Sequence, residues 1–279
     1  MTWEETIKYI RTKEEYKDLV RLAYLDVDLP KNVELYKSGN EYKETLKIIK
    51  KYAPKAKTIL DIGCGNGITS ISFALEGYAV TSVEPDKSET IGSGAIKKLK
   101  NHYNLSNIEI YEDFAENIKF ETNSFDIVFA RQAMHHANNL NKFVAEMARV
   151  LKKGGLFLTV RDHVIYNEED KKWFLNNHPL QKYYGGENAF TSEEYKNAIA
   201  QAGLTLVKEL KFYDSEINYF PSEHYNKSRK QHLKNKIGIF ANFPFVFSLY
   251  NFYIDKKTKQ ISYEKKIPGR MYSYIALKK

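Results

Sequence analysis

The sequence predicts an α/β fold in which helices flank a mostly parallel β-sheet. Five short apolar runs have the length of buried strands: 58–62, 79–84, 107–111, 125–130 and 155–161. Helical patterns alternate with them at the spacing of βαβ units: 66–76, 88–103 and 141–151. The chain has 279 residues, of which 43% are hydrophobic, so it can hold one large domain with additional elements. Because the carboxyl ends of parallel strands meet at one edge, motifs that end strands are candidates for a binding site.

Residues 1–53 are predicted to form helices that precede the sheet. Trp3, Ile7 and Ile10 recur at helical spacing, and Pro54 ends the last helical pattern. Two interpretations stay open for this segment. The helices form either a layer that packs on the sheet or a lid over the binding site, and a lid would bring Tyr24 or Tyr36 near the substrate.

The first apolar run ends in a glycine-rich turn, Asp61-Ile-Gly-Cys-Gly-Asn-Gly67. Glycines at alternate positions permit a tight turn in which backbone N–H groups point outward to a ligand. The turn is not a dinucleotide fingerprint, because Ile68 stands where G-x-G-x-x-G requires its third glycine. It is not a P-loop either, because no Gly-Lys-Ser/Thr sequence follows.

Two acids accompany the turn. Asp61 lies inside the first strand, and Glu84 ends the second. A carboxylate at the end of the second strand can accept hydrogen bonds from both hydroxyls of a ribose. With the turn, these acids resemble motif I and the following acidic motif of class I S-adenosylmethionine-dependent methyltransferases, over residues 45–160.

The resemblance implies a Rossmann-like class I methyltransferase fold, with a seven-stranded, mostly parallel sheet whose last strand is antiparallel. It implies a helical N-terminal lid over 1–53 and a methyltransferase domain over 54–279. It also implies S-adenosyl-L-methionine as the cofactor and S-adenosyl-L-homocysteine as its product. The cofactor-binding residues that it implies are Asp61, Gly63, Cys64, Gly65, Gly67, Glu84, Pro85, Asp113, Phe114 and Arg131.

The end of the third strand departs from the family's pattern. Family members commonly place there an acid that contacts the adenine amino group. In this chain Phe114 stands at the expected position, and Asp113 lies one place before it. Two roles therefore stay open, with Asp113 reaching the adenine or Phe114 packing on its face.

A histidine pair follows the fourth strand, in the segment Arg131-Gln-Ala-Met-His-His136. In similar small-molecule methyltransferases the chain passes beside the transferred methyl group at this point. Because histidine titrates near neutral pH, His135 is a candidate general base and His136 a candidate substrate contact. The alternative is that both histidines are structural.

The fifth strand ends in the polar triplet Arg161-Asp-His163. An Asp–His pair can orient an imidazole to take a proton from a hydroxyl, so Asp162 and His163 are candidate catalytic residues. Arg161 can hold an anionic group of the substrate, such as a phosphate or a carboxylate. The alternative is a loop whose charges form surface salt bridges.

Residues 164–190 are predicted to form an insertion on the substrate side, with a charged helix followed by a polar and aromatic loop. Tyr184, Glu187 and Asn188 of this loop are candidate substrate contacts. A packed loop that leads to the next helix is the alternative. The passage is similar to one in a group of bacterial methyltransferases encoded near surface-polysaccharide genes.

The C-terminal part is predicted to contain two strands and, between them, a helical insertion over 221–260. A sixth strand starts at Leu204, and residues 270–278 alternate like an antiparallel last strand. Residues 237–254 are strongly apolar but contain interruptions such as Pro244, so they do not predict a transmembrane helix. We interpret them as a buried helical cap, with an aromatic substrate wall, a homodimer face or an interfacial membrane contact as alternatives.

Composition narrows the class of protein. The formal net charge is +8, but the lysines are scattered among acids, which is typical of a solvated surface and does not favour nucleic-acid binding. The single cysteine, Cys64, excludes a disulfide framework and a cysteine-based metal site, and we identify no metal ligands. The polar N-terminus carries no signal-peptide pattern, which predicts a cytoplasmic protein.

The combined prediction is an enzyme, a methyltransferase for a small polar acceptor. We expect O-methylation of a hydroxyl on a sugar or a sugar-linked phosphate, with His163 or His135 as the base. An apolar or lipid-linked acceptor, held by residues 237–254, is the first alternative. A catalytically silent cofactor-binding or scaffold module is the second.

Overall fold

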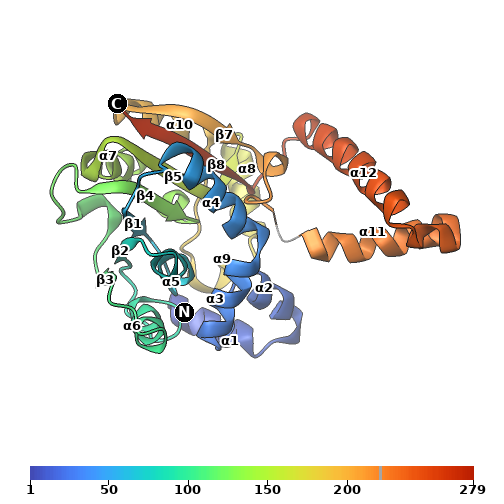
Figure 1. Ribbon diagram of the computed structural model, residues 1–279, viewed down its shortest axis with the longest axis horizontal. Helices are drawn as coiled ribbons and strands as arrows, with labels where there is room; N and C mark the ends of the chain where they lie inside the picture. The colour runs from blue at the N-terminus through green and yellow to red at the C-terminus, as the bar shows by residue number, and fades with distance from the viewer. Residues whose placement is uncertain (220–221) are drawn as a thin grey trace.

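The computed structural model describes residues 1–219 and 222–279 and contains one mixed β-sheet (Figure 1). In spatial order its strands are β3 (Ile108–Tyr111), β2 (Ala79–Val83), β1 (Thr58–Ile62), β4 (Phe125–Arg131), β5 (Leu151–Ile165), β8 (Arg270–Lys278) and β7 (Leu204–Leu210). The predicted strands are confirmed. The sheet has eight strands in place of the predicted seven, because the short β6 (Phe190–Thr191) pairs with the far end of β5.

The strand directions match the predicted fold class. Strands β1 to β5 pair in parallel, whereas β8 runs antiparallel to both of its neighbours, β5 and β7. The strand order reverses between β1 and β4, because β2 and β3 lie on one side of β1 and the later strands lie on the other. A crevice at the carboxyl ends of β1 and β4 is therefore the expected ligand site of this topology.

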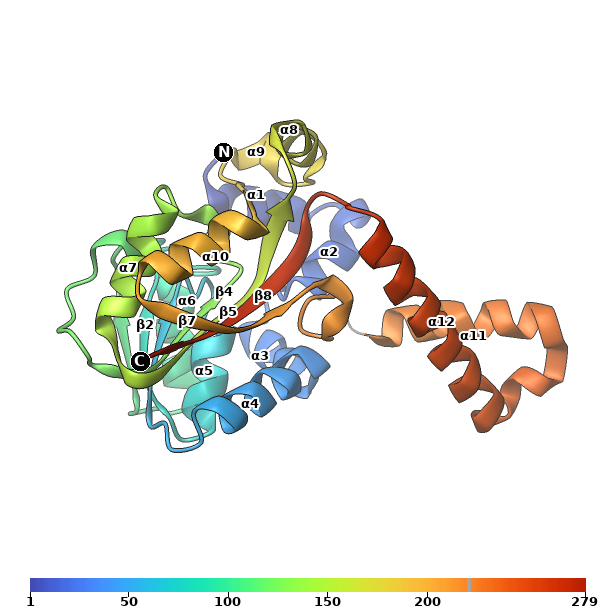
Figure 2. The same ribbon diagram turned by 90° about the horizontal axis from the view of Figure 1, so that it is seen from above.

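Helices cover both faces of the sheet. Successive side chains of each strand point to opposite faces, where they pack against these helices. Leu60 and Val128 belong to the core that includes α7 (Leu140–Val150) and α10 (Ser192–Gln201). Their neighbours Ile59 and Ile127 belong to the opposite core, which includes α5 (Ile68–Leu75) and α6 (Ser93–His102). Figure 2 shows α7 and α10 on one side of the sheet and α5 on the other.

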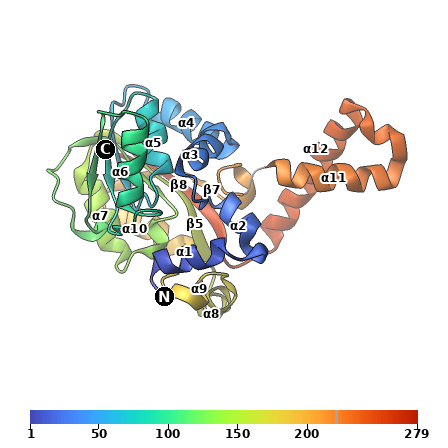
Figure 3. The ribbon, with the colours of Figure 1, turned by 90° about the horizontal axis from the view of Figure 1, so that it is seen from below.

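The N-terminal segment is helical, as predicted, and it divides into two parts. Helices α3 (Leu29–Ser38) and α4 (Asn40–Tyr52) pack on the face of the sheet that α5 covers. Helix α1 (Trp3–Arg11) lies instead beside α9 (Gln181–Tyr184), where Ile7, Ile10, Ile91 and Leu180 form a small separate core (Figure 3). The remaining elements of this region are α2 (Lys17–Leu22) and, after β5, α8 (Glu168–Asn177).

A helical insertion precedes β8, as predicted, but it projects from the domain as a hairpin (Figure 1). The hairpin comprises α11 (Ser222–Ile237), the short helix η5 (Gly238–Asn242) and α12 (Pro244–Glu264), and residue 221 lies outside the described residues. The prediction of a buried cap over 237–254 is wrong, because most of its aromatic side chains are exposed, including Phe245 and Phe252. Two helices that pair mainly with each other have too little facing surface to bury so many rings. None of the helices in the described part of the chain combines the length and hydropathy that a membrane span requires.

Candidate functional site

One cavity opens at the carboxyl ends of β1, β2, β4 and β5, where the topology places a ligand site. Its volume is about 690 Å³, within the range of small-molecule sites. Trp3, Leu19 and Leu25 of the N-terminal segment line it, as do residues of the 178–187 segment. The cavity therefore lies between the strand ends, the N-terminal segment and the 178–187 segment.

The glycine turn at the end of β1 adopts the tight geometry that its sequence predicts. Gly63, Gly65 and Gly67 all have positive φ angles, of 62°, 55° and 81°. A Cβ atom on Gly63 would lie 2.7 Å from the Cβ of Ala133, and one on Gly67 would lie 2.7 Å from Cγ1 of Ile96. Gly63 and Gly65 line the cavity, whereas Gly67 precedes α5 and packs away from it.

Glu84 lies at the cavity wall next to this turn. Its Oε2 accepts a hydrogen bond from the Gly65 N–H at 2.6 Å, and its Oε1 accepts one from the Asp86 N–H at 3.0 Å. Burial raises the pKa of Glu84 to about 7. The carboxylate is thus held by the main chain in a position where it can accept hydrogen bonds from a ligand.

Asp61 lies beneath the turn and does not line the cavity. Its Oδ2 accepts hydrogen bonds from the hydroxyls of Thr69 and Ser70, while its buried Oδ1 has no hydrogen-bond partner. Burial raises the pKa of Asp61 to about 6. An unpartnered buried oxygen is unfavourable, so this atom is a candidate acceptor for a donor supplied by a ligand.

Five further residues that the sequence assigned to the cofactor also line the cavity: Cys64, Pro85, Asp113, Phe114 and Arg131. Phe114 is 63% exposed, and its backbone N–H donates to the side chain of Asp113. Both residues reach the same wall, so the two roles considered for them stay predictions.

The guanidinium of Arg131 is held by a buried glutamate of α4 that sequence reasoning missed. Arg131 Nε donates to Glu41 Oε1 at 2.6 Å, and Arg161 Nη1 lies 3.5 Å from Glu41 Oε2. Burial opposes ionisation of Glu41, but the two arginines hold its pKa below the usual value. No local pattern indicates this contact, because Glu41 resembles the other acid on its helix, Glu44.

Arg161 therefore does not fit its predicted role as a holder of an anionic substrate group. Besides its contact with Glu41, its Nη1 donates to the carbonyl oxygen of Ile217 at 2.9 Å. Its backbone has a φ of 65°, at the point where the register between β5 and β8 shifts. The side chain lines the cavity, but its charge is already engaged within the protein.

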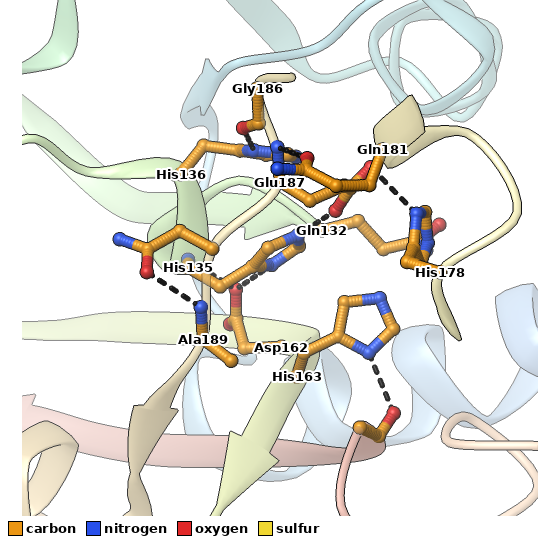
Figure 4. Close-up of polar contacts among 12 residues, drawn as sticks. Gln132, His135, His136, Asp162, His163, His178, Gln181, Gly186, Glu187 and Ala189 are labelled. Atoms are coloured by element: carbon orange, nitrogen blue, oxygen red, sulfur yellow. Dashed lines mark hydrogen bonds and ion pairs between the residues drawn. The ribbon is translucent and has the colours of Figure 1, made fainter. Parts of the chain in front are cut away.

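The candidate catalytic histidines meet at the ends of β4 and β5 (Figure 4). His135 lies in η3 (Met134–His136), directly after β4, and its ring centroid is 4.8 Å from that of His163. The ring centroid of His136 lies 4.1 Å from that of His135, and the ring centroid of His178 lies 5.7 Å from that of His163. All four histidines line the cavity, and His178 is a member that sequence reasoning did not single out.

Asp162 orients His135 and not its neighbour in sequence, which corrects the predicted Asp162–His163 pair. Its Oδ1 accepts from the backbone N–H of His135 at 3.0 Å and lies 3.1 Å from Nδ1 of the same residue. His163 Nδ1 lies 2.7 Å from the carbonyl oxygen of Gly269 instead. Adjacent side chains of a strand point to opposite faces, so Asp162 and His163 do not face each other as a pair.

In each of the two histidines, His135 and His163, the orientation of the ring leaves Nε2 as a hydrogen-bond acceptor. Their Nδ1 atoms face oxygens that accept hydrogen bonds, so Nδ1 carries the proton in the neutral imidazole. Burial lowers the pKa of His163 to about 4 and lowers the pKa of His135 well below its ordinary value. At neutral pH both rings are therefore uncharged.

Glu187 of the loop after α9 faces these imidazoles (Figure 4). Its Oε2 lies 3.8 Å from His135 Nε2, and its Oε1 lies 3.6 Å from His178 Nδ1. The hydroxyl of Tyr184 donates to Oε1 at 2.6 Å, and the backbone N–H of Glu187 donates to the side chain of Gln181 at 2.9 Å. Tyr184 and Glu187 both line the cavity, and their roles as substrate contacts stay predictions.

Two predicted substrate contacts lie elsewhere. Tyr36 does not line the cavity, because its ring is buried between Tyr24, Tyr42 and the guanidinium of Arg131. Asn188 does not line it either, and its Oδ1 accepts from the backbone N–H of Ala189 at 2.9 Å.

Comparisons with known proteins agree with this geometry. Residues 60–159 match the family model described as a methyltransferase domain. The chain is 34% identical over 151 residues to the uncharacterized methyltransferase YcgJ of Bacillus subtilis, covering 50% of this chain and 54% of the relative. It is 25% identical over 179 residues to a fatty-acid O-methyltransferase of Mycolicibacterium smegmatis, covering 62% of this chain and 64% of the relative. The chain thus spans less than two thirds of each of these relatives.

Two solved structures share the fold. The crystal structure of YcgJ aligns with a TM-score of 0.54 and 22% identity, over 84% of this chain and 97% of the other. A geranyl diphosphate C-methyltransferase from Streptomyces coelicolor A3(2) aligns with a TM-score of 0.60 and 13% identity, over 89% of this chain and 83% of the other.

Proposed function

We propose that this chain, which carries a class I S-adenosylmethionine-dependent methyltransferase domain, methylates an oxygen atom of a small molecule. The observation that carries the proposal is one cavity with two kinds of wall. Buried Glu84 and the glycine turn form one wall, and neutral imidazoles form the other. A catalytically silent module that only binds the cofactor would need only the wall formed by Glu84 and the glycine turn.

The residues present fit the cofactor. Gly63 and Gly65 bring the main chain to the cavity without side chains, Glu84 presents a carboxylate for the ribose hydroxyls, and Asp61 has an unpartnered oxygen beneath the turn. When bound, S-adenosyl-L-methionine supplies a methyl group on a sulfonium and leaves as S-adenosyl-L-homocysteine. The protein's main contribution would be to hold the acceptor oxygen in line with that group and to exclude water.

The acceptor side supports an oxygen nucleophile. The Nε2 atoms of His135 and His163 carry lone pairs and lie in the cavity wall, where either can take the proton of an acceptor hydroxyl. Asp162 acts through His135 as a positioning residue, because it bonds both the ring and the backbone of that histidine. Neutral imidazoles are suited to this task, since a protonated ring could not accept the proton.

Of the two acceptor classes, a partly apolar or lipid-linked alcohol is better supported than a sugar phosphate. Arg161, the side chain expected to hold a phosphate, is engaged by Glu41 and Ile217. Apolar side chains such as Phe143 and Met271 line the cavity together with the N-terminal helices. The relative from Mycolicibacterium smegmatis is named as a fatty-acid O-methyltransferase, which agrees with an apolar acceptor.

The first test is calorimetric titration of the purified protein with S-adenosyl-L-methionine and S-adenosyl-L-homocysteine. We expect micromolar binding of both, weakened about 10- to 100-fold by Glu84→Ala, because hydrogen bonds to charged groups contribute about 1.5–3 kcal/mol. Glu121→Ala removes an exposed acid and is the matched control, with no expected effect. A folded protein that binds neither compound would contradict the proposal.

Methyl transfer is then assayed with a radiolabelled methyl group on the cofactor. Fatty acids and long-chain alcohols form one panel of acceptors, and sugar nucleotides form the other. Transfer to the first panel supports the apolar class, whereas transfer to the second alone would reverse our preference. Cofactor binding without transfer to any acceptor in either panel favours the silent binding module.

A further inference from the structure

We propose that His135, His163 and Glu187 form a binding site for a divalent first-row transition-metal ion such as Zn²⁺. The three residues come from η3, β5 and the loop after α9, and they meet in the cavity wall (Figure 4). Two imidazoles and one carboxylate form a ligand set that binds such ions with positions left open for a substrate or water. The sequence revealed no metal motif, because the three residues belong to separate segments.

The distances are close to those of a bound ion. One ligand atom from each of the three residues lies within 4.8 Å of the others, and the His135 Nε2 to Glu187 Oε2 distance is 3.8 Å. Ligand atoms at about 2.0–2.2 Å from a tetrahedral ion are about 3.3–3.6 Å apart. A separation at the 4.8 Å limit must therefore close by about 1.2–1.5 Å, which side-chain rotations can supply.

The hydrogen bonds behind the two histidines are those of metal ligands. Ligating histidines almost always donate their other ring N–H to a carboxylate or to a backbone carbonyl. His135 Nδ1 faces Asp162, and His163 Nδ1 faces the carbonyl oxygen of Gly269. Both partners orient the ring so that Nε2 points its lone pair into the cavity.

A second, independent observation is an unpartnered buried oxygen. The side chain of Glu187 is 6% exposed, and its Oε2 has no hydrogen-bond partner. Nδ1 of His178, 3.6 Å from the other carboxylate oxygen, also has no hydrogen-bond partner. A buried carboxyl oxygen without a hydrogen-bond partner is unfavourable. A bound ion would satisfy this oxygen, and His178 lies close enough to become an additional ligand.

The catalytic consequence rests on the proposed function, although metal binding itself does not. An acceptor hydroxyl that occupies an open position on the ion has a lowered pKa and loses its proton more readily. Its oxygen then forms the new bond to the methyl carbon as the carbon–sulfur bond breaks, and the proton passes to solvent. His135 and His163 would act through the ion and not as free bases.

The test is titration of chelator-treated, full-length protein with ZnCl₂, followed by calorimetry, with Co²⁺ as a spectroscopic probe. We expect one equivalent of Zn²⁺ and an affinity at least about 100-fold weaker in Glu187→Gln. His102→Gln removes an exposed histidine and is the matched control. Asp162→Asn should lower the affinity about 10- to 100-fold, as is usual for partners of metal-bound histidines.

Each outcome separates this inference from the proposed function. Glu187→Gln should keep its affinity for S-adenosyl-L-homocysteine, which also shows that the variant is folded. If the wild-type protein binds that compound but binds no Zn²⁺, or if Glu187→Gln binds Zn²⁺ as tightly as wild type, the metal site is wrong and the proposed function stands. If Zn²⁺ binds but neither cofactor compound does, the proposed function is wrong and the metal site stands.

A different observation carries a second inference, which concerns the projecting hairpin of α11, η5 and α12. Around its turn, Ile239, Phe240 and Phe243 are 58–76% exposed. Along α12, Phe245, Leu249 and Phe252 are 53–72% exposed and recur at helical spacing, so they form one apolar stripe. These residues do not line the cavity, which excludes the substrate-wall interpretation for them.

We infer that this hairpin docks on an anionic lipid bilayer. Between residues 229 and 260 the basic residues are Arg229, Lys230, Lys234, Lys236, Lys256, Lys257 and Lys259, against the single acid Asp255. That acid is already paired with Arg229 at 2.7 Å. Aromatic rings with surrounding lysines are the pattern of helices that lie in the bilayer interface, where each basic residue near an anionic surface contributes about 1 kcal/mol.

Co-sedimentation with phosphatidylglycerol-containing vesicles tests this inference. We expect binding to these vesicles, at least tenfold weaker binding to pure phosphatidylcholine, and loss of binding in the double variant Phe240→Ser/Phe245→Ser. Val27→Ser removes a side chain that is 70% exposed elsewhere and should have no effect. Failure to bind anionic vesicles would overturn the inference, and a dimer that the double variant dissociates would assign the stripe to a second copy of the chain.

Discussion

The cofactor side and the acceptor side of the cavity differ in how their polar groups are satisfied. On the cofactor side, both oxygens of Glu84 accept hydrogen bonds from backbone N–H groups close to the turn. On the acceptor side, Glu187 faces three imidazoles and keeps one buried oxygen without a hydrogen-bond partner. The first arrangement satisfies its polar groups within the protein, whereas the second leaves one carboxyl oxygen that a cation or a hydrogen-bond donor can satisfy.

The difference indicates which parts of the site depend on local sequence and which on tertiary packing. The turn and Glu84 follow β1 and β2 directly, so short motifs specify them. His135, His163 and Glu187 are brought together only when β4, β5 and the loop after α9 pack. Substitutions should therefore affect the two sides separately, unless they change a residue that joins them.

Glu41→Gln should have the largest effect, because Glu41 joins the two sides through Arg131 and Arg161. Removing one partner from a buried ion pair destabilises a protein by about 3–5 kcal/mol. Chemical denaturation should show a loss in that range. Glu146→Gln, which breaks a half-exposed pair with Arg149, should change the free energy of unfolding by at most about 1 kcal/mol. Equal losses of stability in the two variants would show that Glu41 is not a buried connection between the two sides of the cavity.

Gly63→Ala should damage the cofactor side alone. The added Cβ would lie 2.7 Å from the Cβ of Ala133, and the residue has a positive φ. Left-handed strain of about 1–2 kcal/mol and overpacking of about 1–3 kcal/mol predict a loss of about 2–5 kcal/mol in unfolding free energy. Gly154→Ala has the strain but no atom within 4 Å of its new Cβ, so thermal denaturation should show a smaller loss. Metal affinity should survive in Gly63→Ala wherever the protein remains folded.

Cofactor affinity should fall as the pH is lowered from 8 to 6. The pKa of Glu84 in the free protein is about 7. Only the ionised carboxylate can accept hydrogen bonds from both ribose hydroxyls, so the protonated side chain must lose its proton before the cofactor binds. Binding therefore requires deprotonation below pH 7, which predicts affinity about tenfold weaker at pH 6 than at pH 8. Calorimetry across this range checks the slope. Glu84→Gln should bind more weakly and lose the pH dependence, and an unchanged slope in this variant would assign it to another group.

Asp162→Asn should have the smallest effect on the cofactor side. Asp162 bonds His135 and does not line the cavity, so its influence should stay on the acceptor side. We expect a change of less than about twofold in affinity for S-adenosyl-L-homocysteine, because effects of distant, unconnected sites are nearly independent. A tenfold loss, measured by calorimetry on a folded sample, would show that the two sides are coupled.

The sequence predicted the features that depend on neighbouring residues. The strands, the turn of Gly63 and Gly65 and the position of Glu84 follow from apolar runs and from glycines at fixed offsets. Asp162 was paired with the wrong histidine, because adjacency in sequence was taken for adjacency in space. Glu41 and His178 were missed, since an acid on a charged helix and a histidine in a loop carry no local signal.

The aromatic segment 237–254 shows a second limit of sequence reasoning. Its composition predicts burial, yet the structure places it on a hairpin where most of its rings are exposed. Hydrophobicity identifies surface that avoids water, but it does not say whether the chain's own core, a membrane or a partner covers that surface. The helical content of the segment was predicted correctly, because it depends on local pattern alone.

The most direct test of the account is a pair of calorimetric titrations on one folded sample, with S-adenosyl-L-homocysteine and then with ZnCl₂. We expect one equivalent of S-adenosyl-L-homocysteine and one equivalent of Zn²⁺ to bind. We also expect Glu84→Ala to weaken only the binding of S-adenosyl-L-homocysteine, and Glu187→Gln to weaken only the binding of Zn²⁺. Absence of S-adenosyl-L-homocysteine binding by the wild-type protein would contradict the central claim, and loss of both ligands in each folded variant would contradict the division of the cavity into two sides.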